Sequence, residues 1–234
     1  MRRRAAPRGA AGSRGASASR LFFFVTAAAA ALATAAPAGA APQGQGPSLR
    51  AAAELLLLRG DLRRLASRPP LPPANREGLR QRIAGELGLL PWLLRQDGDR
   101  AGANRLRQWQ GRPLADPAAR QALAAAVDAL LARHSFDRAA FLDPAPTIAQ
   151  VQQASAIYGA YCAACHQGMG NGQAGAALPA RDLFLMARRE PPDEFLARMV
   201  QGVKGTAAIR YANPLTARQI GAMAIMFRRE PSPR

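Results

Sequence analysis

The chain has 234 residues, enough for one or two ordinary domains, and 49% of them are hydrophobic, with alanine the main contributor. Only 6% are aromatic, which allows a modest helical core and excludes a large aromatic one. The formal charge of +17 is almost entirely due to arginine, because Lys204 is the only lysine. Enrichment in Arg, Ala, Gly and Pro is typical of a GC-rich genome. Aromatic and basic residues are not interleaved as in single-strand clamps, so we expect no nucleic-acid partner.

The N-terminus has the pattern of a secretory signal peptide. Residues 1–20 contain six arginines and no acid, residues 21–36 are apolar, and Ala38-Gly39-Ala40 offers a small-x-small cleavage site. The apolar run is short for a membrane span of about 20 residues, so an uncleaved anchor is the lesser alternative. Cleavage after Ala40 removes six of the 32 basic residues and leaves 26 against 15 acidic ones, a charge of +11. The signal predicts export to the periplasm or the extracellular space, and we expect a periplasmic protein.

Apolar residues at helical spacing follow a short lead-in at residues 41–48. Ser48 is expected to cap a first helix and Asn75 a second, with the proline-rich run 69–73 between them. Pro91 should kink or end the second helix.

Residues 95–113 show no regular pattern, and Asp116-Pro117 then begins a third helix, with a capping residue before a proline at the first helical position. DPAPT at 143–147 is the best candidate for a domain boundary. We therefore expect a small helical bundle over residues 41–145, of unknown role, and a second domain over 146–234.

The second domain contains two capping boxes, Thr147 with Gln150 and Thr216 with Gln219, each at the start of an apolar periodic segment. Between them lie a glycine-rich loop at 168–179 and two further helical segments. No segment of the chain has the pattern of a strand, and no internal repeat is present. The sequence predicts an all-α fold.

The run YCAACHQ, residues 161–167, holds both cysteines of the chain and one of its two histidines. A structural zinc site requires four ligands, and only distant His134 is left to join Cys162, Cys165 and His166. A thioredoxin-type dithiol requires a βαβ setting, and no strand precedes the motif. A plain disulfide stays possible but leaves the adjacent histidine and the glycine loop unexplained.

Attachment of a c-type haem fits this run better. Two cysteines three residues apart on one helical turn present both sulfurs toward one edge of a porphyrin, where they can bond its two vinyl groups. The next residue, His166, is then placed to ligate the iron. We predict one covalently attached haem c, held by Cys162, Cys165 and His166, with haem iron as the only metal and no catalytic side chain.

With that motif and the helices around it, residues 147–230 resemble a class I cytochrome c. The resemblance implies a cytochrome c-like helical domain whose first and last helices cross, with Tyr158, Gly159 and Phe227 at the matching positions. It also implies that the carbonyl of Pro179 accepts a hydrogen bond from the ring of His166.

The family normally supplies a methionine as sixth iron ligand from the loop before the last helix. That loop, residues 202–216, contains no methionine, and the expected position falls at Ile209 to Tyr211. Met199 and Met223 have the helical spacing of core residues, and His134 is expected to complement the end of a helix. Other substitutes are weaker: Met169, Met186, Lys204, Tyr211 and Met226.

The leading functional prediction is a periplasmic monohaem protein that carries single electrons between redox partners, such as a membrane or periplasmic dehydrogenase or oxidase. The arginine-rich surface would favour acidic partners, or simply be solvated. The missing methionine motivates an alternative, a haem enzyme or small-ligand sensor with an open sixth iron site. A thiol protein without haem is the third hypothesis.

Overall fold

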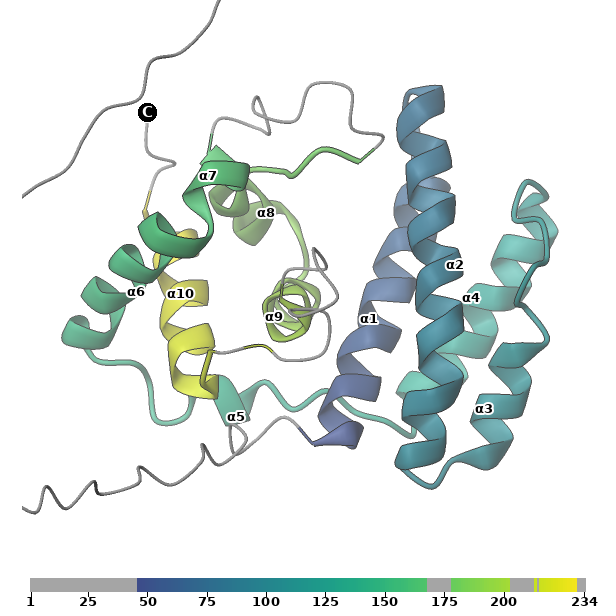
Figure 1. Ribbon diagram of the computed structural model, residues 1–234, viewed down its shortest axis with the longest axis horizontal. Helices are drawn as coiled ribbons and strands as arrows, with labels where there is room; N and C mark the ends of the chain where they lie inside the picture. The colour runs from purple at the N-terminus through teal and green to yellow at the C-terminus, as the bar shows by residue number, and fades with distance from the viewer. Residues whose placement is uncertain (1–45, 168–177, 203–212, 214, 231–234) are drawn as a thin grey trace, which may run out of the picture. The chain divides into compact units, whose positions relative to one another are not determined.

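The computed structural model describes residues 46–167, 178–202, 213 and 215–230. Its first four helices bury their leucines against one another. These helices are α1 (Pro47–Leu65), α2 (Pro73–Gln96), α3 (Arg100–Arg107) and α4 (Pro117–Leu131). Helix α1 packs along α2, with α4 against α1 and α3 against α2 (Figure 1). The members of their shared core are Ala51, Leu55, Leu58, Leu62, Leu79, Ile83, Leu87, Leu90, Leu93, Leu94, Ala103, Leu106, Leu114, Leu123, Val127 and Leu130.

Helices α1 and α2 begin before the capping residues predicted for them. Each begins with a proline, Pro47 or Pro73, and neither has a side-chain cap. A proline suits the first helical position, because its φ is already helical and its missing N–H would have no partner there. Ser48 and Asn75 therefore lie inside the helices, and their prediction as caps is wrong.

Helix α4 begins as predicted, with the carboxylate of Asp116 accepting from the backbone N–H groups of Ala118 and Ala119. Helix α3 was not predicted. The carboxylate of Asp99 caps it by accepting from the N–H of Gly102 at 2.7 Å. A cap and a few buried contacts are thus enough to make a helix of this largely polar segment.

Pro91 neither ends nor interrupts the described helix α2, which continues to Gln96. Proline cannot donate to the carbonyl one turn earlier, so the carbonyl of Leu87 loses its helical partner. The side-chain amide of Gln110 replaces it, donating to that oxygen at 2.9 Å. The predicted end of the helix at Pro91 is therefore wrong, and a residue from outside the helix satisfies the freed acceptor. The alternative, a kink at Pro91, stays a prediction.

The remaining helices surround an aromatic core. They are α5 (Ala139–Leu142), α6 (Ile148–Tyr161), α7 (Ala163–His166), α8 (Leu183–Arg189), α9 (Pro192–Gln201) and α10 (Ala217–Arg229). Phe227 makes edge-to-face contacts with Tyr158, Phe184 and Phe195, with ring centroids 5.5, 4.9 and 5.9 Å away. Both predicted capping boxes, at the starts of α6 and α10, are present.

Helices α6 and α10 pack against each other as the sequence predicts, and Tyr158 meets Phe227 between them. Gly159 does not lie in this contact: it is exposed, and a Cβ built on it would meet nothing within 4 Å. Ala154, one turn before Tyr158, is completely buried instead. The glycine that a close approach requires is Gly221, where a Cβ would lie 2.0 Å from the carbonyl oxygen of Phe141.

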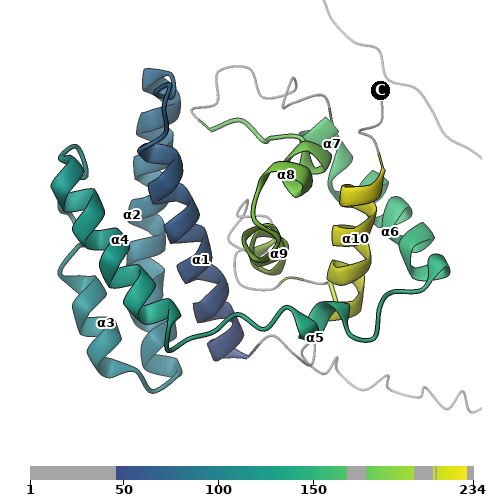
Figure 2. The same cartoon turned by 180° about the vertical axis from the view of Figure 1, so that it is seen from behind.

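Helix α1 contributes to both cores, since Ala53, Leu56 and Leu57 belong to the second cluster. Figures 1 and 2 show α9 between α10 and α1, and α9 contacts both. A Cβ at Gly60 would meet the carboxylate of Glu194, so α1 passes close to this side chain of α9 at Gly60. The domain boundary between residues 145 and 146 stays a prediction.

The secondary structure is all-α: the described residues form helices and no strand. None of the described helices combines the length and the apolar character that crossing a membrane requires.

Candidate functional site

The CAACH motif lies where helix α6 ends. Cys162 follows the last residue of α6, and its backbone N–H donates to the carbonyl of Tyr158 at 2.9 Å. The chain then makes the single turn of α7, in which the N–H of His166 donates to the carbonyl of Cys162 at 3.0 Å. Cys162, Cys165 and His166, the three predicted site residues, therefore occupy one short turn.

The two cysteines are free thiols with different surroundings. Cys162 is half-buried and packs against the second core, whereas Cys165 is exposed. Burial, and to a smaller extent the neighbouring Cys165, raises the pKa of the Cys162 thiol. Across the described part of the chain, no group of three or more His, Cys, Asp or Glu residues is arranged to hold a metal ion.

His166 is oriented by a backbone carbonyl. Its Nδ1 lies 2.6 Å from the carbonyl oxygen of Arg181, which can only accept, so Nδ1 carries the proton. Nε2 then keeps its lone pair free for a metal. The predicted acceptor, the carbonyl of Pro179, is wrong: the bond goes to a residue two positions later.

Tyr158 connects the aromatic core to the motif. Its ring contacts Phe184 and Phe227 edge to face, while its hydroxyl is buried and hydrogen-bonds to nothing in the described residues. Burial, then the charges of Asp182 and Cys162, raise the pKa of this hydroxyl. A buried hydroxyl without a partner beside Cys162 is a polar atom for which a bound group at this site could provide a partner.

His134, the other histidine of the chain, has no nitrogen available for a metal. Its Nδ1 lies 2.9 Å from Oδ2 of Asp97 and its Nε2 lies 3.0 Å from Oδ2 of Asp99. Burial raises the pKa of Asp99, but hydrogen bonds from His134, Arg133 and the Gly102 N–H outweigh it and hold the pKa well below its ordinary value. His134 therefore fastens the end of α4 to the turn between α2 and α3.

Four of the six methionines lie in described helices, and all four are buried in the second core: Met186, Met199, Met223 and Met226. The core role predicted for Met199 and Met223 is confirmed, and Met226, a weaker candidate for the sixth ligand, packs in the core too. Met169, Lys204 and the expected ligand position at Ile209 to Tyr211 lie outside the described residues.

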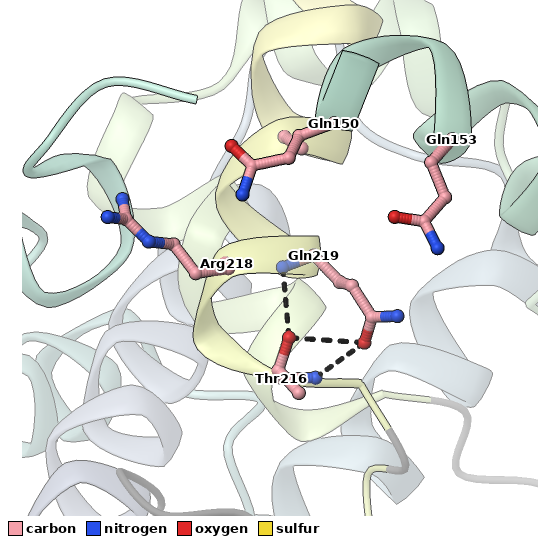
Figure 3. Close-up of a pocket in the computed structure, with 6 residues that line it drawn as sticks. Gln150, Gln153, Thr216, Arg218 and Gln219 are labelled. Carbon is pink, nitrogen blue, oxygen red and sulfur yellow. Dashed lines mark hydrogen bonds between the residues drawn. The ribbon is translucent and has the colours of Figure 1, made fainter. Parts of the chain in front are cut away.

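An open pocket lies away from the motif, at the N-terminal ends of α6 and α10. Figure 3 shows Gln150 and Gln153 of α6 across from Gln219, whose side chain is engaged in the capping box with Thr216. Gln150 precedes Cys162 by roughly 18 Å of helix at 1.5 Å per residue. This pocket is therefore separate from the cysteines and His166.

One comparison with known proteins finds a match, and the matched residues include the motif. Residues 149–225 match the family model described as cytochrome C oxidase, cbb3-type, subunit III. Residues 149–225 are a class I cytochrome c domain. No curated protein and no solved structure matches the chain.

Cytochrome c domains bind haem and transfer electrons, so the match implies haem c with its iron. It also implies redox partners, which the match does not identify. The motif fits that group, because two free thiols and an imidazole with a free Nε2 lie on one turn. The sequence did not predict the role of the Arg181 carbonyl, nor the ion pairs of Arg181 and Arg198 with Glu190. The first is a backbone group that no side-chain pattern identifies, and the second depends on contacts between distant helices.

Proposed function

We propose that this chain is a periplasmic cytochrome with one haem c, which carries single electrons between redox partners. The observation that carries the proposal is the CAACH turn at the end of α6, inside the cytochrome c domain, with His166 held at Nδ1 by a backbone carbonyl. That arrangement provides two anchoring thiols and one oriented iron ligand, and no acid–base pair beside them is needed for electron transfer.

Each residue of the motif has one role in this proposal. The thiols of Cys162 and Cys165 would each hold the haem through one carbon–sulfur bond to a vinyl group, with the thiol hydrogen going to the other vinyl carbon. His166 ligates the iron through Nε2, while the bond from Nδ1 to the Arg181 carbonyl fixes the ring and raises its basicity. The bound iron supplies the exchange of one electron between its ferric and ferrous states.

The location follows from the predicted signal peptide, which ends at Ala40 and lies outside the described residues. Covalent attachment suits an exported protein, because a dissociated cofactor would be lost there. We propose membrane or periplasmic dehydrogenases or oxidases as partners, and the match to a subunit of an oxidase supports that class. A mature protein whose N-terminal residue is Ala41 would be expected from mass spectrometry.

The test is expression of the full chain in a host that attaches haem c, followed by optical spectroscopy and intact mass. We expect one added haem and a pyridine haemochrome with two thioether bonds. Cys162→Ala and Cys165→Ala should each retain at most one bond and move the haemochrome band to longer wavelength. His134→Gln is the matched control for His166→Gln, since only the latter should alter the iron spectrum. A colourless wild-type protein would overturn the proposal.

An open iron site is the second candidate function, because residues 202–216 contain no methionine. In that case the protein would bind small ligands or act on them. Addition of carbon monoxide to the reduced protein separates the two functions. An unchanged spectrum supports a closed carrier, whereas a rapid shift supports a ligand-binding haem protein.

A further inference from the structure

The carbonyl that holds His166 belongs to a residue whose side chain is itself fixed. The guanidinium of Arg181 is half-buried and donates from Nη2 to Oε1 of Glu190 at 2.5 Å. Glu190 directly follows α8 and also accepts from Nε of Arg198 at 2.8 Å. Burial alone would raise the pKa of Glu190, but Arg198 and Arg181 outweigh it and lower that pKa, so the carboxylate is charged at neutral pH.

Arg198 continues the chain of contacts into the N-terminal helices. Its Nη2 donates to Oε1 of Glu194 at 2.8 Å and to Oδ1 of Asp61 at 3.3 Å. Asp61, on α1, is completely buried and also accepts from Nε and Nη2 of Arg82, on α2. A continuous series of charged hydrogen bonds therefore joins α2 and α1 to the residue that orients His166.

We infer that Asp61, Arg198, Glu190 and Arg181 are positioning residues that couple helices α1 and α2 to the ring hydrogen bond of His166. The inference rests on the proposed attachment of haem at that histidine. Through this series the N-terminal helices adjust the basicity of the iron ligand, and so the reduction potential of the domain.

The direction of the effect follows from the hydrogen bond. A firm bond from Nδ1 to the Arg181 carbonyl increases the electron density on the imidazole, which favours ferric over ferrous iron. If Arg181 loses its anchor, the carbonyl is less well held and the bond weakens. The reduction potential should then rise.

Removal of a charge would confuse this test, because losing a carboxylate near the iron raises the potential by itself. Arg198→Lys avoids the difficulty, since it retains the charge and loses the planar fork that contacts Glu190, Glu194 and Asp61 at once. Arg181→Lys also retains the charge, and it alters the contact between residue 181 and Glu190, which is closer to His166 in the series. The control is Arg138→Lys. Arg138 forms an exposed ion pair with Asp193 at 3.6 Å, and this pair lies outside the series.

The experiment uses the full exported protein after its haem content has been measured. We expect a higher reduction potential and faster solvent exchange of the His166 ring N–H by NMR in Arg198→Lys and Arg181→Lys, with Arg138→Lys equal to the wild type. Potentials and exchange rates that stay at the wild-type values would overturn the coupling and leave the haem assignment intact. Absence of haem from the wild type would overturn both. If Arg198→Lys does not fold, Arg82→Lys takes its place, because it retains the charge and loses the two-point contact with Asp61. An unchanged potential in that variant would overturn the coupling to α2.

Discussion

The Asp61→Asn substitution should destabilise the fold by about 3 kcal/mol, because it breaks a buried charge pair without changing the shape of the side chain. Asp61 is completely buried and faces Arg82, Arg198 and Arg64. Losing one partner of a buried pair costs about 3–5 kcal/mol when the other cannot reach water. Arg82 is 27% exposed and can turn outward, and Arg198 keeps its two glutamates, so the lower end of that range applies.

Thermal unfolding followed by circular dichroism should show this loss as a midpoint lower by about 6–12 °C, at about 2–4 °C per kcal/mol for a domain of this size. Burial raises the pKa of Asp61, but the contacts with Arg82 and then with Arg198 and Arg64 outweigh it and lower that pKa below its ordinary value of 3.8. The stabilisation is therefore complete above that ordinary value and is lost as the pH falls through the lowered one. The difference between wild type and variant should be constant near neutral pH and shrink in acid. A midpoint within about 2 °C of the wild type at neutral pH, less than 1 kcal/mol, would refute the reasoning.

Three further predictions concern the helices. Gln110→Leu removes the donor to the Leu87 carbonyl and should cost about 1–3 kcal/mol in urea unfolding, the penalty for an unsatisfied buried acceptor; a loss below about 0.5 kcal/mol would mean that another group replaces the amide. Phe227→Leu keeps much of the volume but loses three edge-to-face contacts, each about 0.5–1.5 kcal/mol, and a change within error would contradict their contribution. Thr147→Ala removes the capping box of α6 and should cost about 1 kcal/mol by the same assay, whereas an unchanged midpoint would show that the N-terminus of α6 contributes nothing to stability.

Helix starts were predictable where one side chain decides them. Asp116, Thr147 and Thr216 each accept from a backbone N–H two or three residues ahead, and that bond depends only on local sequence. The prediction failed where two local signals compete. Ser48 is a good cap, yet the helix begins at the preceding proline, whose fixed φ already suits the first turn.

The candidate site was identified from local sequence alone, because the spacing of Cys162, Cys165 and His166 is itself the signal, and the roles of these residues stay a prediction. The partner of His166 was not predictable in this way. The acceptor carbonyl depends on which of residues 178–182 lies beside the ring of His166, and a shift of two residues moves the bond from Pro179 to Arg181. Nothing in the local sequence distinguishes one backbone carbonyl from another. The identity of the residue matters all the same, because proline has no side chain that a distant carboxylate could hold.

The ion pairs of the buried arginines were also not predictable from the sequence. A high arginine count predicts a solvated surface, and most of the described arginines do lie at least partly exposed. Arg198 is nonetheless mostly buried: only 13% of its side chain is exposed, and its partner Asp61 lies 137 residues earlier in the chain. No helical period relates two such positions, so only the packing of α1 on α9 reveals the pair. Since a buried charge pair is seldom a net gain in stability over apolar packing, its value here is better explained by the geometry that it imposes on Glu190, and through it on Arg181.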